Sequence, residues 1–393
     1  MQLNKSKEEC CGCTACENIC AHNAITMIPD KLGFLYPKIN NDLCVDCGLC
    51  EKVCSFHDKY DNTLNLQNPL PYAVRHKEIN EILTSQSGAA FIAFSDWILD
   101  NGGVVYGAAY DKHFKVIHER ATNKTERNRF KGSKYIQSDL KNIFKQIKND
   151  LKNGILVLFT GTPCQTSGLS SFIGNKLRNN LFLIDLICHG VSGPGIWEEY
   201  LKYLENKEKK PITAVNFRDK SKYGWRSHVE TFQFSNKFTH SYEYKFYTHI
   251  MLRNSCYSCP FTNLKRPSDI TIGDFWGIEN TELASFAEDN KGCSLVLINT
   301  IKGEKWFDNI SNSINYKKTN LKECLQPNLQ QPTTIHPQRN KFEKEFVNKG
   351  FIYVMTKYGN IGWKYKTKKI LHRIKNKLYS FIPQFIKQTF NNK

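Results

Sequence analysis

Eight cysteines, arranged in two runs of identical spacing, constrain this chain more than any other feature. Each run reads Cys-x2-Cys-x2-Cys-x3-Cys, and 23 residues separate the two runs. The cysteines are Cys10, Cys13, Cys16 and Cys20 in the first run and Cys44, Cys47, Cys50 and Cys54 in the second. This spacing is typical of domains that hold two 4Fe-4S clusters.

The same spacing predicts which cluster each thiolate ligates. Three cysteines spaced by two residues lie on one compact turn and reach three irons of one cube, whereas the fourth points to the other cluster. Cluster one is expected to use Cys10, Cys13, Cys16 and Cys54, and cluster two Cys44, Cys47, Cys50 and Cys20. Zinc ribbons also use Cys-x2-Cys pairs, but they leave the repeated fourth cysteine unexplained.

Three residues near these runs depart from the bacterial ferredoxin pattern. Ala21 and Ser55 follow the fourth cysteines, where proline is usual, and Cys11 is surplus to the spacing. We expect Cys11 to be packed or exposed, although it could replace Cys10 as a ligand. The substitutions for proline affect loop rigidity or potential rather than ligation.

Length and composition indicate two or three globular domains. The chain has 393 residues, of which 40% are hydrophobic. The expected divisions are a bacterial-type 2x4Fe-4S ferredoxin domain (1–57), a polar linker (58–78), two parts of one α/β region (79–153 and 154–330) and a basic, helical tail (331–393). The ferredoxin domain has little hydrophobic core, so its clusters hold it together, around a hairpin that turns near Pro29–Gly33. The fold class is thus α+β followed by α/β.

The ends and the cysteines favour a cytoplasmic protein. The first ten residues contain no apolar core, so no secretory signal is expected. The sequence contains no run of 18 apolar residues, so no transmembrane helix is expected. Cysteines that serve as cluster thiolates fit a reducing cytosol better than an oxidising compartment.

The tail is strongly basic. Formal net charge is +18, and residues 364–393 contain nine Lys or Arg and no acid. Ile370, Leu371, Ile374 and Leu378 share one helical face opposite this charge. The profile predicts either a peripheral helix at the inner membrane face, on anionic lipid, or a helix packed on its own protein with a solvated basic face. No nucleic acid is expected, because no motif for it accompanies the charge.

Two loops in the second part have phosphate-binding chemistry. The small-residue loop from Thr84 to Ala90 precedes a helix at 91–100 and a strand at 104–110. A Ser/Gly loop at a helix start offers N–H groups to a phosphate, but it also serves as an ordinary cap. The loop from Lys131 to Ser138 precedes a predicted helix at 139–151, and its residues alone favour a solvated loop.

A predicted βαβ unit brings two further cysteines to one edge. An apolar strand at 155–160 ends near Cys164, and a second at 181–188 ends at Cys188. Because sites lie outside the carboxyl ends of parallel strands, both cysteines can share one rim. Together with Cys256 and Cys259 they supply the four ligands of a third cluster; the alternative is two buried thiols plus a redox pair. Cys293 and Cys324 are expected to be core thiols.

Residues 80–280 resemble the beta-subunit family of coenzyme F420-reducing hydrogenases and dehydrogenases. The matching stretches occur in family order: Ser87-Gly88 through Tyr106-Gly107, Gly132 to Ser138, Gly161 to Gln165, Asp185 to Gly190, Phe217 to Lys220, Cys256 to Pro260, and Asp269 to Gly277. With the N-terminal ferredoxin pattern, the chain is similar to bacterial members encoded among polysaccharide-biosynthesis genes.

The resemblance implies an FAD bound in the α/β region, an adjacent 4Fe-4S cluster and exchange of electrons with a hydride carrier. It implies cofactor contacts at Ser87, Gly88, Gly132, Ser133, Lys134, Tyr135, Gln137, Gly161 and Thr162. The family's Ser-Gly-Gly is Ser87-Gly88-Ala89 here, which bears on the closest approach to the flavin.

Three functions follow from these features. The first is a flavin-dependent oxidoreductase that exchanges electrons with a redox partner protein or hydride carrier. His189, beside Cys188, is then a candidate proton donor, with a structural hydrogen-bonding role as the alternative. The others are an electron-relay subunit without its own substrate and a non-catalytic partner of glycan-assembly enzymes.

Overall fold

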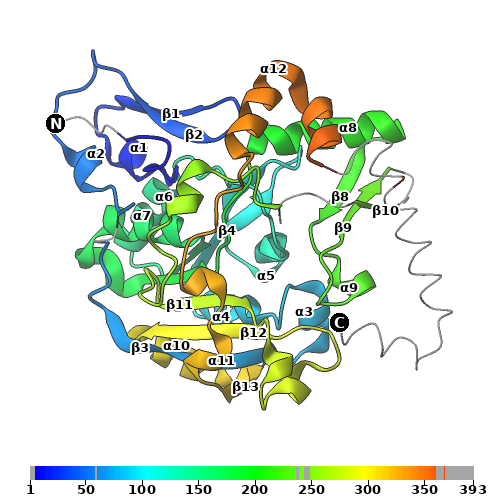
Figure 1. The fold of residues 1–393 in the computed structure, drawn as a ribbon. Coiled ribbons are helices and arrows are strands. Elements are labelled where there is room, and N and C mark those ends of the chain that lie inside the picture. The colour runs from blue at the N-terminus through cyan, green and yellow to red at the C-terminus, as the bar shows by residue number, and fades with distance from the viewer. Residues whose placement is uncertain (1–4, 58–59, 236–238, 243–247, 360–366, 368–393) are drawn as a thin grey trace.

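A mixed sheet of eight strands forms the centre of the molecule (Figure 1). The computed structural model describes residues 5–57, 60–235, 239–242, 248–359 and 367. The strands of this sheet are β3 (Asn65–His76), β4 (Val104–Tyr110), β5 (Val116–Ala121), β6 (Val157–Gly161), β7 (Leu181–Leu186), β11 (Ile270–Asp274), β12 (Ser294–Thr300) and β13 (Ile314–Lys318). Their order is β13-β3-β12-β11-β7-β6-β4-β5.

The middle of the sheet is parallel. Strands β4, β6, β7 and β11 run in one direction, while β5, β12, β3 and β13 are antiparallel to their neighbours. The predicted βαβ unit is confirmed as β6, α7 (Pro163–Ile173) and β7. Helix α7 begins at a proline, which fits the first turn, and the Gln165 Oε1 accepts the Thr162 N–H at 3.0 Å.

Helices cover both faces of the sheet. On one face, α4 (Ala90–Asp100) and α10 (Ile301–Ile310) pack on buried side chains such as Leu158. On the other, α6 (Ile143–Lys152) and α7 pack on the alternate residues, such as Val157 and Phe159. This alternation follows from the two-residue period of a strand, and it explains why β6 is apolar at nearly every position. Helix α6 begins four residues later than the predicted start at 139.

The predicted linker at 58–78 is wrong over most of its length. Residues 65–76 form β3, which lies between β12 and β13. Two prolines made this segment look like a loop, but β13 pairs only with Tyr72–His76. The nitrogens of Pro69 and Pro71 therefore face a side of the strand without a regular ladder, where proline is tolerated. The regions 79–153 and 154–330 both contribute strands to this one sheet.

The N-terminal segment has the expected ferredoxin-type elements. They are α1 (Ala15–Ile19), β1 (Ile25–Pro29), β2 (Leu35–Ile39) and α2 (Leu49–Lys52). Strands β1 and β2 pair antiparallel, which confirms the predicted hairpin. The hairpin turn contacts the α/β region directly: the Gly195 N–H donates to the Leu32 carbonyl at 2.9 Å. Gly33 has φ +86°, and a Cβ there would lie 2.3 Å from the Gly195 nitrogen, so the close approach requires glycine.

A smaller sheet lies beside the large one. It contains β8 (Ile212–Asn216), β9 (Glu230–Phe234) and β10 (Thr239–Tyr242), in the order β10-β9-β8. Helices α8 (Pro194–Glu208) and α12 (Arg339–Lys357) share a core with it, and Gly350 interrupts α12 with φ +76°. The remaining short helices are α3 (Ile79–Thr84), α5 (Lys124–Arg127), α9 (Lys220–Tyr223) and α11 (Leu321–Cys324), and the 3-10 turns are Asn128–Phe130, Asn175–Asn180, Asn254–Ser258, Ile278–Asn280, Ala284–Ala287, Ser311–Ser313 and Pro327–Leu329.

The predicted basic tail is only partly covered by the structure. Its first portion contains α12, whose buried Phe342 and Phe351 pack against the core of α8. The apolar face at Ile370, Leu371, Ile374 and Leu378 lies outside the described residues. In the part of the chain that is described, no helix combines the length and the apolarity needed to cross a bilayer.

Candidate functional site

Cys10, Cys13, Cys16 and Cys54 lie together. Burial raises the pKa of the Cys16 thiol, and the neighbouring thiols of Cys13, Cys10 and Cys54 raise it further. Burial likewise raises the pKa of Cys54, and Cys13 and Cys10 add to that effect. The last cysteine of the second run is therefore a neighbour of the first run, as the crossed assignment to cluster one predicts.

The second run is closer to solvent. Cys47 is exposed, and Leu43, Val45 and Leu49 beside it are exposed apolar side chains. Cys20 accepts the Ala24 N–H at 3.3 Å. A cluster held by Cys44, Cys47, Cys50 and Cys20 would thus be the outer one and could meet a partner molecule.

Cys13, one of the cysteines assigned to cluster one, lies against α7. A Cβ on Gly168 would come within 2.7 Å of the Cys13 Sγ, so the helix surface is hollowed for that sulfur. Phe56 and Phe261 form an apolar contact between the two regions, with ring centroids 5.9 Å apart. Cys13, Cys54, Cys164 and Cys259 all pack around this contact.

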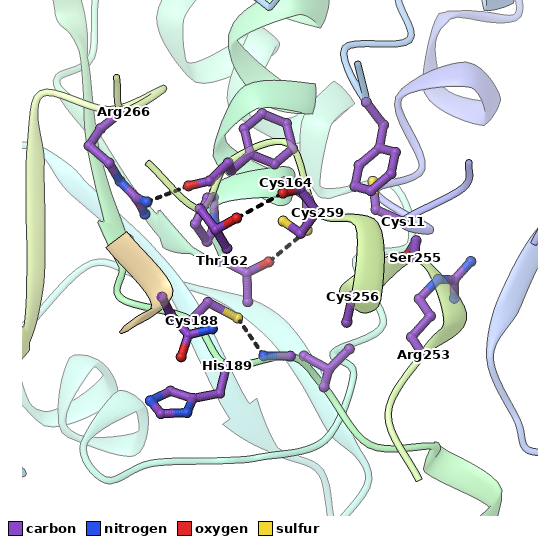
Figure 2. A pocket seen from close by; sticks show the side chains of 17 residues that line it. Cys11, Thr162, Cys164, Cys188, His189, Arg253, Ser255, Cys256, Cys259 and Arg266 are labelled. Atoms are coloured by element: carbon purple, nitrogen blue, oxygen red, sulfur yellow. Dashed lines mark hydrogen bonds between the residues drawn. The ribbon is translucent and has the colours of Figure 1, made fainter. Parts of the chain in front are cut away.

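All four cysteines of the predicted third cluster line one small cavity of about 30 Å³ (Figure 2). Cys164 lies in the first turn of α7, Cys188 follows β7, and Cys256 and Cys259 come from the 3-10 turn at 254–258 and its C-terminal neighbour. The carboxyl ends of two parallel strands therefore meet the Cys-x2-Cys loop at one rim, as the topology rule predicted.

The thiols of this cavity differ in pKa because their surroundings differ. Burial raises the pKa of Cys256 to about 11 and that of Cys188 further, and the Cys256 thiol adds to the effect on Cys188. A hydrogen bond with Cys11 lowers the pKa of Cys164 to about 7, against the effect of burial. The Gly190 N–H donates to the Cys188 Sγ at 3.4 Å, and the Thr162 Oγ1 lies 3.2 Å from the Cys164 Sγ.

Cys11 is the fifth cysteine of this cavity. It is buried and packs against both Cys13 and Cys164, which the sequence assigned to different clusters. Cys11 is therefore packed, which is one of the two environments expected for it from the sequence. It lies between the cysteines assigned to cluster one and those assigned to the third cluster. Cys293 and Cys324 are buried elsewhere in the core, as predicted.

A larger cavity of about 520 Å³ opens beside the cysteine cavity. The two share Thr162, Cys188, His189, Gly190 and Val191 as lining residues. Of the nine predicted cofactor contacts, seven line the larger cavity: Ser87, Gly132, Ser133, Lys134, Tyr135, Gly161 and Thr162.

The other two predicted contacts lie elsewhere. Gly88 packs against the sheet, where a Cβ would come within 2.1 Å of the Val74 carbonyl oxygen. The Gln137 Nε2 donates to the Cys11 carbonyl at 3.0 Å and its Oε1 accepts from Arg253 at 2.8 Å. Gln137 therefore faces the ferredoxin domain instead of the cavity.

Lys134 is a buried cation at the wall of the larger cavity. Its Nζ donates to three backbone carbonyls, those of Phe130 at 3.4 Å, Lys131 at 3.1 Å and Gly132 at 3.2 Å. Burial, with a smaller contribution from Arg129, lowers the pKa of Lys134 to about 7. An anionic group in the cavity would favour the charged form of this amine.

His189 borders both cavities, but Figure 2 shows its imidazole turned away from the Cys164 and Cys259 sulfurs. Burial lowers the pKa of His189, and His249 lowers it further. Both effects disfavour the charged ring, so His189 is a weaker base than a free imidazole.

Sequence reasoning missed a polar group at the far wall of the larger cavity. Asp274, at the end of β11, accepts hydrogen bonds from Ser87, Arg218 and, at 2.5 Å, the Trp225 Nε1. The Trp225 ring stacks on Trp276 with centroids 5.0 Å apart. Ser87, Arg218 and Asp274 lie in segments that the sequence singled out separately, but no local signal shows that a strand end gathers them.

Comparisons with known proteins agree with both halves of this arrangement. Residues 9–57 match the family described as 4Fe-4S dicluster domain. Residues 155–323 match the family described as the C terminus of the coenzyme F420 hydrogenase/dehydrogenase beta subunit. No curated protein matches the chain.

A solved structure is also similar. It is a chain of the xenon-derivatised F420-reducing NiFe hydrogenase complex from Methanosarcina barkeri, 14% identical, with 75% of this chain and 92% of that chain covered and a TM-score of 0.46. That score is too low to carry an argument. Residues 9–57 therefore match 4Fe-4S dicluster domains, and residues 155–323 match the C terminus of beta subunits in the coenzyme F420 hydrogenase/dehydrogenase family.

Proposed function

We propose that this protein is an iron–sulfur flavoprotein oxidoreductase that passes electrons between its 4Fe-4S clusters and an FAD beside a hydride-accepting substrate. The observation that carries the proposal is the shared wall: Cys188 and His189 line both the cysteine cavity and the larger cavity. A cluster in the first and a flavin in the second would be close neighbours. Iron–sulfur clusters supply single-electron transfer, and a flavin supplies two-electron and hydride chemistry.

The cysteines fit clusters better than a single metal ion. Among the residues that the structure describes, no three His, Cys, Asp or Glu side chains converge as they would around one ion. A cubane instead spreads four thiolates over four irons, so its ligands lie further apart. Four thiols from three elements around one cavity support Cys164, Cys188, Cys256 and Cys259 as the ligands of a third cluster.

The larger cavity fits a dinucleotide-sized ligand. Its volume of about 520 Å³ lies in the range of small-molecule sites, and its wall is mostly apolar, with Phe91, Phe130 and Ile272 among its residues. Lys134 adds positive charge at this wall, and because its three donors already go to backbone carbonyls, it would favour a phosphate through that charge and not through a hydrogen bond. Ser133 and Tyr135 are adjacent on the same loop.

The order of the sites suggests the route of the electrons. The exposed Cys47 region is the entry point for a redox partner, and the group around Cys13 lies against α7. The Cys11 thiol bridges from Cys13 to Cys164, and the Cys188 loop leads to the larger cavity. His189 would exchange a proton with the substrate there. A role in polysaccharide biosynthesis and a membrane contact through the tail remain predictions from the sequence.

The test is anaerobic purification followed by measurement of iron, sulfide and flavin in the same sample. Three clusters and one FAD require about twelve irons per chain. Cys256→Ser should remove about four irons and retain flavin, because Cys256 lines only the cysteine cavity. Cys293→Ser is the matched control, since that buried thiol lies in a different core, and it should lose none.

Two other outcomes would change the assignment. About eight irons with flavin would remove the third cluster and keep the flavoenzyme. The same iron content without flavin, even after reconstitution, would contradict the oxidoreductase mechanism and leave an electron relay or a binding role. A holoprotein that reduces dyes but no organic substrate would favour the relay.

A further inference from the structure

Arg253 joins the ferredoxin domain to the α/β region. Its side chain is 1% exposed, and it precedes the 3-10 turn that carries Cys256 (Figure 2). On the ferredoxin side, its Nε donates to the Cys10 carbonyl at 2.8 Å and its Nη2 to the Leu35 carbonyl at 2.9 Å. On the other side, its Nη1 donates to the Gln137 Oε1 at 2.8 Å.

The charge of Arg253 has no carboxylate partner among the ion pairs of the described residues. The other deeply buried arginines each have one: Arg127 with Asp96, Arg218 with Asp274, Arg266 with Asp185 and Arg339 with Glu343. The contacts of Arg253 are carbonyl oxygens, an amide oxygen, the Tyr36 ring at 4.1 Å and the Cys10 Sγ at 3.6 Å from Nη2.

A buried guanidinium without an anion is costly. Arginine stays protonated in proteins, so it cannot escape the cost by losing its proton. Burial of a charge is tolerated when an opposite charge compensates it. The Cys10 sulfur is the group nearest to Arg253 that would become anionic, as one of four thiolates on a cubane whose total charge is negative.

We propose that Arg253 is the fixed counter-charge of cluster one, the inner cluster, and raises the reduction potential of that cluster. This rests on the ligand assignment of Cys10 made above. Reduction adds one electron to the cluster, and a fixed positive charge in a low-dielectric interior stabilises that added negative charge. The hydrogen bond to a ligand sulfur acts in the same direction. A raised potential at the inner cluster would favour the transfer of electrons toward the cysteine cavity, which Arg253 also lines.

A docking role alone would make a different prediction. Gln137 hydrogen-bonds to Arg253 and to the Cys11 carbonyl, so it holds the same two regions together without a charge. Gln137→Ala thus weakens the contact and leaves the charge in place, whereas Arg253→Gln removes the charge. Arg253→Lys keeps a charge and loses the planar fork of donors.

Iron and sulfide are first measured in the anaerobic holoprotein. The experiment is then a potentiometric titration that is monitored by visible absorption and by EPR of the reduced clusters. In Arg253→Gln, one midpoint should move to a more negative potential and the outer cluster's midpoint should stay. Arg253→Lys should have a midpoint potential close to that of the wild type, and Gln137→Ala should shift none of the midpoint potentials.

The remaining outcomes of this titration also support or overturn the charge role of Arg253. Unchanged midpoints in an Arg253→Gln protein with full iron would overturn the proposal, as would an equal shift in Gln137→Ala. If Arg253→Gln loses the inner cluster, restoration of that cluster by Arg253→Lys supports a charge role and failure to restore it contradicts one. A protein that shows the shift but binds no flavin keeps this inference and loses the proposed function.

Discussion

Gly168 lies directly under Cys13, and a β-carbon on the glycine would meet the sulfur at 2.7 Å. Gly168 is in the interior of α7, where its backbone is helical, so alanine would be accepted by the helix itself. In a helix, Gly→Ala alone stabilises by about 0.5–1 kcal/mol. At this position the added methyl group instead collides with a sulfur that a cluster would hold in place.

We therefore expect Gly168→Ala to destabilise the protein by about 1–3 kcal/mol, the range of overpacked cores, and to lower the iron content of the inner cluster. Thermal unfolding and iron analysis of the holoprotein measure both effects. Ser171→Ala, at an exposed position of the same helix, is the control and should be neutral. A stabilised Gly168→Ala protein with full iron would contradict the placement of Cys13.

Lys134 and Lys302 form a natural pair for testing the flavin site. Both are lysines whose amine donates to three backbone carbonyls, but only Lys134 lines the larger cavity. Burial lowers the pKa of Lys302 to about 8 and that of Lys134 to about 7. We expect Lys134→Met to lower the flavin-to-protein ratio at least several-fold and Lys302→Met to leave it unchanged. Equal flavin content in both variants would place the phosphates elsewhere.

His118 should make stability depend on pH. Its Nδ1 lies 2.7 Å from the Ser138 Oγ and its Nε2 3.0 Å from the Thr160 carbonyl oxygen, which fits a neutral ring that donates from Nε2. Burial lowers the pKa of His118 from 6.5 to about 4. Between these two pH values, His118 is therefore protonated in the unfolded chain and neutral in the folded protein. The free energy of unfolding thus falls as the pH falls.

Between about pH 7.5 and about pH 5 this single residue should cost the folded state about 2 kcal/mol. The measurement is the thermal midpoint of the holoprotein at several pH values in that range. His118→Asn keeps a polar side chain and does not titrate. The thermal midpoint of this variant should therefore depend less on pH, even if the variant is less stable at every pH. An unchanged slope would mean that the ring accepts a proton in the folded protein.

The sequence predicted the candidate site best where ligand spacing or strand order decides the geometry. The two ferredoxin runs need only their spacing, and the meeting of Cys164 with Cys188 needs only parallel strands that end at one rim. Contacts between distant segments could not be predicted in this way. Arg253 lies 243 residues from Cys10, and nothing in its own neighbourhood indicates that it approaches the ferredoxin domain.

The same limit explains the misplaced linker. Residues 65–76 contain two prolines and the polar residues Asn65, Gln67 and Asn68 near their start, so their local preferences favour a loop. They form a strand because β12 offers a complete partner and β13 pairs only with the far end. Tertiary pairing thus overrides local propensity in β3, whereas β6 is apolar enough to be predicted from its own residues.

The last prediction concerns the ion pair behind the cysteine cavity. The Arg266 Nη2 donates to the Asp185 Oδ1 at 3.0 Å and to the Leu186 carbonyl at 3.0 Å, and both charged side chains are almost fully buried. Burial raises the pKa of Asp185, while Arg266 opposes that change. Removing one partner should cost about 3–5 kcal/mol, because it leaves the other charge buried without compensation.

We expect Arg266→Met or Asp185→Asn alone to lower the thermal midpoint strongly and to lower the iron content, since Cys188 follows the same strand. The double variant removes both charges and should recover most of the lost stability. Glu198→Gln, which breaks an exposed ion pair with Lys202, is the control and should change stability by no more than about 0.5 kcal/mol. A double variant as unstable as the sum of the single ones would show that Arg266 acts through its carbonyl contacts instead of its charge.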